Sequence, residues 1–559
     1  MAIGWADIQD WDPANLNTTS ENLSTARSTL MTEAQEASGA KSRVQSTGTA
    51  VDAMLTTLGS LNKDLDTLVN DVSELMMATS EASNGVWDVQ TKVQECTSFT
   101  EQYPYLTIST DGTVDYDRFD SGRTGNENTD KALKQSDDAE NSTRSTKSSE
   151  LDGMVTGAIN RAVEVDEAYR DRLKAVYDGT YQCDETSASE SQGLPDLPQE
   201  GWSATEVSAW WNSLTEDEKN KIIAEHPEAI GNLDGISMDA RGKANEIRLQ
   251  TERTKAAKEL AAAEAARDKW DMNSLEYEAA QQKVDKARLK VEDLEKIKEL
   301  IYPNGDPLLS DNIPKSPYNL LYLDASGDGD VRAAISVGDV DTAENVTTLV
   351  PGIGTTARAE EGGLSDLLGH AKAARNAAGA DNTAAVAWLG YDAPPKVGEI
   401  SDAYKGHQWE YMNANRADEA APALNSFHEG IHSWHQSQGT DPNLTTAGHS
   451  YGSLVTGTAL TSSKTGVVDA ATLYGSPGAH GDSVHDFNVP KDHMYVSRNT
   501  GDLVTRMWLD SEFGPEPDKI DGMTHISSGS GGHSAYWNNP EFVEDVGQIA
   551  AGEDPSVDR

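Results

Sequence analysis

Long apolar runs are missing from this sequence of 559 residues. A helix needs about 20 consecutive, mostly apolar residues to cross a bilayer, and no stretch of the chain approaches that length. The first residues, MAIGWAD, also lack the basic and apolar segments of a conventional signal peptide. We therefore expect no transmembrane segment and no conventional signal peptide, which leaves a cytoplasmic location or secretion by another route.

Cysteine is scarce, since only Cys96 and Cys183 occur. Each falls near the end of a different predicted helix, and in a simple antiparallel hairpin those two ends lie far apart. A disulfide cannot join two cysteines whose Cα atoms are more than about 7 Å apart. We expect two free thiols, and so few cysteines do not settle the redox compartment.

Basic residues are few relative to acidic ones: 45 Lys and Arg oppose 93 Asp and Glu, and the formal net charge is −48. A chain this acidic is repelled by nucleic acid and by anionic membrane surfaces. We expect no nucleic-acid partner and favour a well-solvated surface as the explanation of the charge. The length exceeds that of one ordinary core and predicts two or three domains.

Proline is absent between Pro13 and Pro104. Within this stretch apolar residues recur at alternating steps of three and four from Val51 to Cys96, and only Thr79 in the series is polar. The pattern predicts a long helix that packs on partner helices. The following residues 107–149 are rich in Ser, Thr, Asp and Asn, which indicates a loop or exposed extension before a second helix.

We interpret residues 1–190 as a helical hairpin domain. Trp5, Trp11 and the helix start that follows resemble the beginning of WXG-type modules, which occur in substrates of type VII secretion. A Trp-x-Gly turn is absent, but the Tyr-x-x-x-acid spacing of the secretion tag occurs at Tyr116 and Tyr181. The resemblance implies type VII export and a helical protein partner that binds this domain.

Residues 191–305 are expected to form a linker and a helical arm. Two prolines and Gly201 mark the linker. Residues 239–301 are free of proline and rich in Ala, Lys, Glu and Arg, and a turn at 271–274 would make them an antiparallel hairpin with Ser274 as N-cap. Such an arm can act as a lid or a docking surface, although a solvated helical hairpin is the simpler interpretation.

Strand and helix patterns alternate over residues 306–559, the third predicted domain. This alternation predicts a mostly parallel sheet. The expected strands lie at residues 320–323, 333–337, 347–350, 385–389, 444–447, 471–474 and 494–497. The expected helices lie at residues 364–378, 408–436 and 454–460.

The most informative stretch is Gly448-His449-Ser450-Tyr451-Gly452, which has the pattern G-x-S-x-G between a strand-like and a helix-like run. A nucleophile elbow has this context, because its turn is sharp and the residues that flank the serine must be small. A helix N-terminus also favours negative charge, which suits an oxyanion beside Ser450. The pentapeptide alone is weak, since Gly and Ser are common.

An acid and a histidine follow in the order that α/β-hydrolases use. Asp502 lies in a glycine-containing loop after a predicted strand, and His533 lies in a glycine-rich loop before the last helix. We predict Ser450 as the nucleophile, His533 as its base and Asp502 as the acid that orients the histidine. His525 is an alternative histidine, and the alternative acids, in poorer strand-end contexts, are Asp469, Asp482 and Asp510.

A second glycine-rich loop, at residues 351–355, follows the predicted strand at 347–350. Such a loop can present a free backbone N–H. We predict that the N–H groups of Ile353 and Tyr451 form the oxyanion hole that stabilises a tetrahedral intermediate.

These residues resemble an actinobacterial α/β-hydrolase family that was once catalogued as a domain of unknown function. The resemblance covers about residues 200–540, and its motifs lie at residues 210–215, 226–236, 350–355, 448–453, 474–478, 502 and 533–537. It implies the α/β hydrolase fold, with a doubly wound, mostly parallel sheet, and a serine hydrolase activity. It does not give a substrate.

Two patterns suggest metal sites but have simpler explanations. His428, Glu429 and His432 match the H-E-x-x-H of zinc proteases, yet they occupy the helix before the elbow strand. Residues 324–330 resemble the start of an EF-hand, but Ile335 stands where a bidentate Glu is required. The glycines of residues 352–354 lack the third member of a dinucleotide motif. We expect no metal and no cofactor.

The leading hypothesis is a serine hydrolase that cleaves an ester, less readily an amide, of a small-molecule or lipid-like acyl substrate. The alternative is a type VII-secreted interaction or effector protein whose helical half binds a partner and whose hydrolase half is degenerate. A stable partner complex without serine reactivity would favour the alternative.

Overall fold

The computed structural model describes residues 3–43, 46–181, 197–198, 201–310, 312–327, 329–395, 413–490, 492–506 and 513–555. The chain forms two compact units. The first comprises Met1–Pro198 and Ala209–Thr215, and the second comprises Gln199–Ser208 and Glu216–Arg559. The finer division into 1–190, 191–305 and 306–559 stays a prediction.

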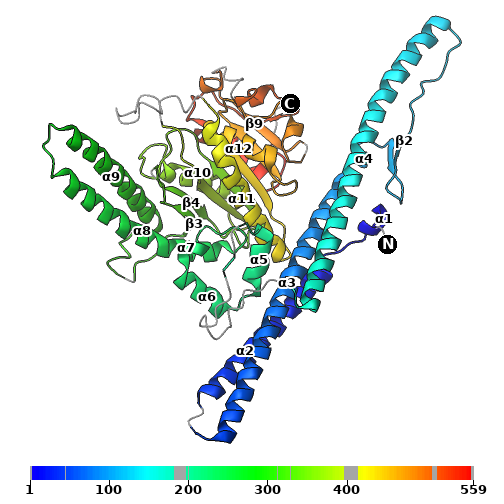
Figure 1. Cartoon of the computed structure of the whole chain (residues 1–559). Coiled ribbons are helices and arrows are strands. Elements are labelled where there is room, and N and C mark those ends of the chain that lie inside the picture. Colours follow the sequence, from blue (N-terminus) through cyan, green and yellow to red (C-terminus); the bar gives the residue numbers. More distant parts are fainter. Residues whose placement is uncertain are drawn as a thin grey trace. The chain divides into compact units, whose positions relative to one another are not determined.

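The first unit consists of long helices and one short β-hairpin (Figure 1). The predicted apolar stripe runs along a single long helix, α3, and the part of it near Val89 and Cys96 is buried against α4. Cys96 is a free thiol, as predicted, whereas Cys183 lies outside the described residues. The elements are α1 (Trp5–Ile8), α2 (Ala14–Ser42), α3 (Thr49–Gln102), β1 (Leu106–Ile108), β2 (Val114–Tyr116) and α4 (Glu127–Asp178).

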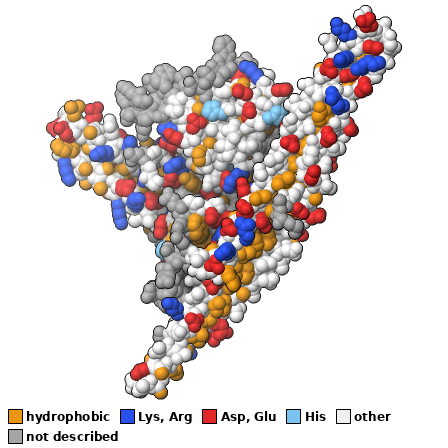
Figure 2. Space-filling view, turned by 45° about the vertical axis from the view of Figure 1, so that its right-hand side comes forward, with side chains coloured by type: hydrophobic (Ala, Val, Ile, Leu, Met, Phe, Trp, Pro, Cys, Tyr) orange, Lys and Arg blue, Asp and Glu red, His pale blue; other side chains and the backbone are white. Residues whose placement is uncertain are grey.

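The other end of the α3 stripe is open to solvent. Met54, Leu61 and Leu68 are 43%, 47% and 47% exposed. Figure 2 shows hydrophobic side chains gathered along the surface of this helical unit. A heptad pattern therefore predicted the helix but not the extent to which its apolar face is covered.

The expectation of a loop over residues 107–149 is wrong from Glu127 onward, where α4 begins. The side chain of Asn126 caps this helix by accepting hydrogen bonds from the N–H groups of Asn128 and Thr129, at 3.2 Å each. Farther along, the ion pair of Arg144 with Glu140 joins side chains four residues apart, a spacing that supports a solvated helix. Capping and side-chain pairs thus sustain a helix that has few apolar residues.

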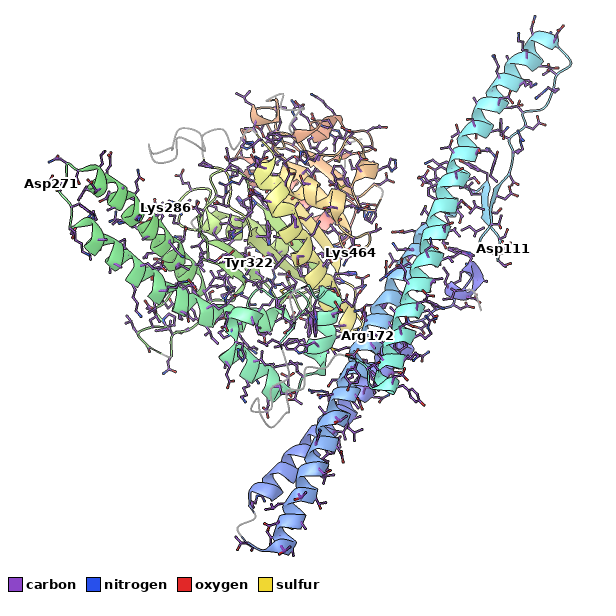
Figure 3. The ribbon with its side chains drawn as sticks, viewed as in Figure 1. Asp111, Arg172, Asp271, Lys286, Tyr322 and Lys464 are labelled. Atoms are coloured by element: carbon purple, nitrogen blue, oxygen red, sulfur yellow. The ribbon has the colours of Figure 1, made fainter. Side chains whose placement is uncertain are left out.

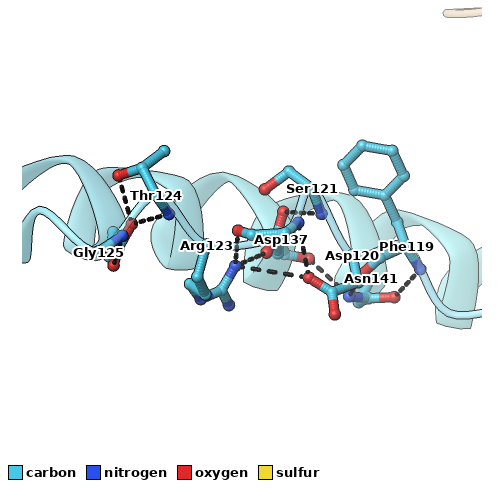
Figure 4. Close-up of polar contacts among 10 residues, drawn as sticks. Phe119, Asp120, Ser121, Arg123, Thr124, Gly125, Asp137 and Asn141 are labelled. Atoms are coloured by element: carbon cyan, nitrogen blue, oxygen red, sulfur yellow. Dashed lines mark hydrogen bonds and ion pairs between the residues drawn. The ribbon is translucent and has the colours of Figure 1, made fainter.

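The segment before α4 is tied to the helix by two buried polar side chains (Figure 4). Asn141 exchanges hydrogen bonds with both backbone groups of Phe119, at 2.9 Å each. Asp137 accepts a bond from the N–H of Ser121 and pairs with Arg123 at 2.9 Å. These contacts hold the loop along the polar part of α4, which composition alone did not indicate.

The second unit begins with helices and a helical arm. The arm is the antiparallel pair α8 and α9, and Asp271 marks the turn between them (Figure 3). Ser274 caps α9 by accepting a hydrogen bond from the N–H of Tyr277 at 3.1 Å, which confirms the predicted turn and N-cap. The helices are α5 (Ala204–Ser213), whose residues from Ala209 onward are assigned to the first unit, α6 (Glu216–Glu225), α7 (Pro227–Ile230), α8 (Met238–Arg267) and α9 (Leu275–Ile301).

An eight-stranded sheet follows, in the order β10-β9-β8-β7-β5-β6-β4-β3. The pairs β3–β4 and β4–β6 are antiparallel and all other pairs are parallel. This confirms the predicted fold class, a mostly parallel α/β hydrolase sheet preceded by long helices. The strands are β3 (Tyr318–Asp324), β4 (Arg332–Val337), β5 (Asn345–Val350), β6 (Thr383–Leu389), β7 (Asn443–His449), β8 (Ala470–Tyr474), β9 (Met494–Ser497) and β10 (Thr524–His525).

Two hydrophobic clusters lie on the two faces of this sheet, because successive strand residues point to opposite faces. One joins Val346 of β5 to helices α11 (Asn415–Ser437) and α12 (Tyr451–Ser462). The other joins Leu349 of β5 to α10 (Leu364–Ala378) and α14 (Pro540–Ala550). Leu249 and Leu294 of the arm belong to this second cluster, so the arm shares a core with the sheet.

No helix within the described ranges is long and apolar enough to cross a membrane. The loops that follow the parallel strands β5, β7, β8 and β9 leave the sheet at the carboxyl ends of these strands. In open α/β sheets ligands bind at this edge, and the predicted site residues lie there.

Candidate active site

Ser450 occupies the turn between β7 and α12. Its φ of 56° and ψ of −127° lie outside the regions that non-glycine residues usually adopt, and its residue surface is only 4% exposed. At Gly452 a Cβ atom would come within 2.3 Å of the carbonyl oxygen of Pro351. The G-x-S-x-G pattern therefore corresponds to a strained turn with no room for larger neighbours, as a nucleophile elbow requires.

The structure brings Ser450, His533 and Asp502 into one hydrogen-bonded series. The Nε2 atom of His533 lies 2.7 Å from Ser450 Oγ, and its Nδ1 atom lies 2.9 Å from Asp502 Oδ2 and 3.1 Å from Oδ1. Asp502 is fully buried, whereas a quarter of the His533 side chain is exposed. The three residues come from loops after β7, β9 and β10, which meet at the same edge of the sheet.

Tyr536 is a further member of this group that the sequence prediction missed. Its hydroxyl donates to Asp502 Oδ2 at 2.8 Å, and the N–H of Val504 donates to Oδ1 at 2.9 Å. Burial acts to raise the pKa of Asp502, but the bonds from His533, Tyr536 and Val504 outweigh it and lower the pKa overall. Asp502 is therefore a carboxylate. Tyr536 lies three residues after His533, and this spacing within residues 533–537 was the available signal.

Asn499 fixes the loop of His533 to the loop of Asp502. Its backbone N–H donates to the Tyr536 hydroxyl at 3.1 Å. Its side chain accepts a bond from the N–H of Gly529 at 2.7 Å and donates to the carbonyl of Gly532 at 3.2 Å. These bonds set the distance between the carboxylate and the imidazole.

His449, the residue before the serine, holds His533 from the other side. Its Nε2 atom lies 2.9 Å from the backbone carbonyl of His533. A carbonyl only accepts hydrogen bonds, so Nε2 of His449 carries the proton. Burial lowers the pKa of His449 to about 3, and its ring stacks on Tyr474 with centroids 4.9 Å apart. His449 is thus a neutral support of the His533 backbone.

The predicted oxyanion donors belong to Tyr451, which follows Ser450 in the chain, and to Ile353 in the loop after β5 that lines the same cavity. Among the described residues, neither the N–H of Ile353 nor that of Tyr451 has a hydrogen-bond acceptor. The loop that carries Ile353 approaches the serine closely, because a Cβ atom at Gly352 would lie 2.6 Å from Ser450 Cβ. Two unused donors beside the serine can receive a negatively charged oxygen.

A cavity of about 510 Å³ opens onto Ser450 and His533. Its described lining combines aromatic rings, among them Trp537, with the carboxyl groups of Glu361 and Asp366, and includes no Lys or Arg. His370, which the sequence prediction missed, stacks on Trp537 with centroids 4.8 Å apart, and burial lowers the pKa of His370 to about 4. The described lining therefore offers two exposed carboxyl groups and no Lys or Arg.

The alternative site residues lie elsewhere or outside the described part of the chain. His525 is exposed on the edge strand β10. Asp469 accepts a bond from the N–H of Leu444, at the opposite ends of β7 and β8 from the elbow. Asp482 is exposed and donates its N–H to Asp486, and Asp510 is outside the described residues.

The side chains of the H-E-x-x-H pattern have different surroundings. His428 is 1% exposed, Glu429 pairs with Lys464 at 2.6 Å, and His432 lies 3.6 Å from Asp441. Throughout the described ranges no group of three or more His, Cys, Asp and Glu residues could hold a metal ion.

In the EF-hand-like stretch, two carboxylates pair with arginines. Asp324 pairs with Arg332, and Asp330 lies 2.6 Å from Arg358. Asp328, between them, is outside the described residues. Carboxylates that neutralise arginines are poor candidates for calcium ligands, which need uncompensated oxygens.

Comparison with known proteins adds a family to this geometry. The family described as "Alpha/beta hydrolase" matches residues 326–511. The uncharacterized protein Rv0963c of Mycobacterium tuberculosis (strain ATCC 25618 / H37Rv) is 35% identical over 222 residues, which cover 38% of this chain and 78% of that protein. The chain belongs to the alpha/beta hydrolase family.

Other relatives of this alpha/beta hydrolase are longer. The uncharacterized protein Rv2079 of the same organism is 31% identical over 330 residues, or 56% of this chain, and the chain spans only 45% of that relative's length. A solved cold-adapted esterase from an Arctic intertidal metagenomic library aligns with 42% of this chain and 93% of its own, at 15% identity and a TM-score of 0.28. A similarity this low says nothing about activity.

Proposed function

We propose that this alpha/beta hydrolase is a serine hydrolase that cleaves an ester of a small-molecule or lipid-like acyl substrate. The observation that carries the proposal is the unbroken series from Ser450 Oγ through His533 to Asp502, with bonds of 2.7 and 2.9 Å. A serine at a strained turn, a histidine within reach and a buried carboxylate behind it make a nucleophile of an otherwise weak hydroxyl.

The first half of the reaction forms an acyl-enzyme. Ser450 Oγ attacks the ester carbon while His533 Nε2 takes the hydroxyl proton. Asp502 holds the Nδ1–H of His533 and stabilises the imidazolium that results. The carbonyl oxygen becomes negative and accepts bonds from the N–H groups of Tyr451 and Ile353, backbone donors of the kind that stabilise a tetrahedral intermediate.

The second half returns the serine. The imidazolium gives its proton to the leaving alkoxide, and the ester C–O bond breaks. Water then attacks the acyl carbon with His533 as base, the acid is released, and the proton returns to Ser450. An alkoxide leaves more readily than an amine, so we assign esters before amides.

The charge of the cavity bears on the substrate. Glu361 and Asp366 face the space next to Ser450, and no described lining residue is cationic. Both carboxylates are exposed, so solvent and salt screen their charge. We expect neutral acyl groups to react moderately faster than acyl groups that end in a carboxylate, and the difference should shrink as the salt concentration rises. A neutral p-nitrophenyl butyrate and an ester with a terminal carboxylate on the acyl chain make the comparison.

The deciding experiment is labelling with a fluorophosphonate probe, followed by intact-mass measurement. The wild type should gain one adduct as Ser450 Oγ displaces fluoride, and Ser450→Ala should gain none. His533→Ala should react at least about 10³-fold more slowly, because the serine then lacks its base. His525→Ala is the matched control and should react like the wild type. A well-folded wild type that takes no label contradicts the proposal.

We propose a second role for the helical unit, type VII export or binding of a helical partner, and the exposed side chains of Met54, Leu61 and Leu68 favour it. If the hydrolase half were degenerate, a stable partner complex would form without any serine reactivity. Replacing the three residues with Gln should then weaken the complex and leave labelling of Ser450 unchanged. If the protein is detected only inside cells, although the export machinery of these cells is intact, export is contradicted. A cytoplasmic location is then the remaining expectation.

A further inference from the structure

The loop between β5 and α10 builds one wall of the cavity at Ser450. Residues 351–353 and 355 line the cavity at the beginning of this loop, and residues 361–363 line it at the end. The N–H of Ile353, which faces the oxyanion position in the proposed reaction, belongs to the first part. The position of this loop therefore matters for any chemistry at Ser450.

The beginning of the loop is held by hydrogen bonds to the segment that follows β6. The hydroxyl of Tyr391 donates to the carbonyl of Pro351 at 2.6 Å. The N–H of Gly354 donates to the carbonyl of Pro394 at 2.7 Å. Both partners lie in the segment after β6, so this half of the loop is held by its neighbour in the fold.

The middle of the loop is held by the helical arm instead. Asp293 of α9 accepts a hydrogen bond from the backbone N–H of Arg358 at 2.9 Å, and its other oxygen lies 2.7 Å from the Arg358 guanidinium. The N–H of Val331 donates to the same carboxylate at 3.2 Å. Arg358 also pairs with Asp330 at 2.6 Å.

This contact is buried and polar, unlike most of the arm. The Asp293 side chain is 0% exposed. Burial raises the pKa of Asp293 to about 6, against the opposing effect of Arg358, so the carboxylate is ionised at neutral pH. A buried carboxylate is costly unless charge and hydrogen bonds compensate it. Two backbone N–H groups and the Arg358 guanidinium do so here, and they fix Asp293 and Arg358 in a single geometry.

We propose that Asp293 is a positioning residue for the active site: it anchors Arg358 and so, together with the bonds of Tyr391 and Pro394 to the first part, fixes the loop that presents the Ile353 N–H to the nucleophile. The arm is then a support of the cavity wall, and not a lid or a separate module. The catalytic part of this inference rests on the proposed hydrolase function, whereas the anchoring of the loop can be measured without it.

The same arm offers a matched control. Arg253 of α8 forms a two-pronged pair with Asp306, at 2.9 and 2.7 Å, and also bonds Glu295 of α9 at 2.8 Å. This pair joins the two helices to the segment after them, and none of its members lines the cavity. Asp306→Asn therefore weakens the arm without touching the loop of Ile353.

The test compares Asp293→Asn, Arg358→Lys and Asp306→Asn in the full chain. Kinetics with p-nitrophenyl butyrate should show that Asp293→Asn lowers kcat at least tenfold and changes KM less than threefold, because the oxyanion bond forms fully only in the transition state. Arg358→Lys keeps the positive charge and the bond from the backbone N–H of residue 358 to Asp293, so kcat should fall less than in Asp293→Asn. Asp306→Asn should keep kcat within twofold, even if it lowers the melting temperature as much.

Hydrogen–deuterium exchange gives a readout that needs no activity. Peptides covering residues 351–363 should exchange at least fivefold faster in Asp293→Asn than in the wild type. In Asp306→Asn the same peptides should exchange at the wild-type rate. Unchanged exchange and kcat in folded Asp293→Asn, or an equal loss in both arm variants, would overturn the inference. If Asp293→Asn does not fold, Arg358→Lys decides by the same two measurements. A wild type that takes no fluorophosphonate while exchange still depends on Asp293 would refute the hydrolase proposal alone.

Discussion

The two units of the chain bury charged side chains to different extents. The core of the helical unit is mostly apolar, and cross-helix charge pairs such as Arg172 with Glu74 lie at its partly exposed edges. Among the described residues the sheet unit buries more charged side chains, including Asp502 and Asp293, whereas Arg27 and Asp137 are buried in the helical unit. All 12 histidines also lie in residues 226–533, outside the helical unit. Buried polar groups are costly unless each one is satisfied, so their concentration in one unit marks where chemistry, and not only packing, is built in.

The largest difference between the two units is expected when one tyrosine in each is replaced with phenylalanine and the rate of Ser450 labelling is compared. Tyr536→Phe removes a hydrogen bond to the Asp502 carboxylate, and such bonds to charged groups contribute about 1.5–3 kcal/mol. We expect the second-order rate of fluorophosphonate labelling to fall about 10- to 100-fold, since each 1.4 kcal/mol is a factor of ten.

The control is Tyr169→Phe in the helical unit, where the hydroxyl lies 3.2 Å from Thr79 Oγ1. It should lower stability by about 1 kcal/mol at most and leave labelling unchanged. Equal labelling rates for the two variants would remove the distinction between the units.

Acidification should act on the sheet unit first. Burial lowers the pKa of His428 to about 3, and its ring nitrogens have no hydrogen-bond partner among the described residues. Below the ordinary histidine pKa of about 6.5 the unfolded chain takes up a proton that the folded chain refuses, so stability is lost as the pH falls from about 6.5 toward 3. The loss per histidine is at most about 1.4 kcal/mol for each pH unit.

His428→Phe should flatten this dependence and raise stability at pH 5, because it removes both unpartnered nitrogens. Calorimetry at pH 7, 6 and 5 measures how the stability depends on pH. His525→Phe, a change at an exposed position, is the control and should show the same pH dependence as the wild type. The helical unit contains no histidine, so its transition should lack the histidine-dependent part of this slope. Identical slopes for all three proteins would contradict the expectation.

The smallest effect is expected at the surface of the helical unit. Arg172 reaches from α4 to Glu74 of α3 at 2.8 Å and is 28% exposed (Figure 3). Partly exposed ion pairs contribute about 0–1 kcal/mol because solvent screens them. Arg172→Met should therefore lower the unfolding free energy by no more than about 1 kcal/mol, measured by urea denaturation, and leave Ser450 labelling unchanged. A loss above about 2 kcal/mol would mean that this unit also depends on charge pairs.

Much of the fold could be predicted from local patterns. Proline-free stretches, the 3–4 stripe of α3 and the cap at Ser274 specify helices through neighbours in the chain, and the structure confirms these elements. The loop expectation failed over the first turns of α4, because Asn126 and the side chains of Asp137 and Asn141 supply support that composition does not reveal. Ser450, Asp502 and His533 were named from motif order and lie in contact, while their catalytic role stays a prediction.

The sequence by itself determined the helical and strand segments, the mostly parallel sheet and the sharp turn at Ser450, because each follows from the periodicity and size of adjacent residues. Only the tertiary structure decided that Tyr536, His449 and Asn499 hold the site together, and that Asp293 meets Arg358, 65 residues farther along the chain. Those contacts join segments distant in sequence, and no local pattern encodes the distance between two loops. The physical reason is that periodicity reports which face of an element is buried, whereas the partner of a buried polar group depends on how the whole core closes.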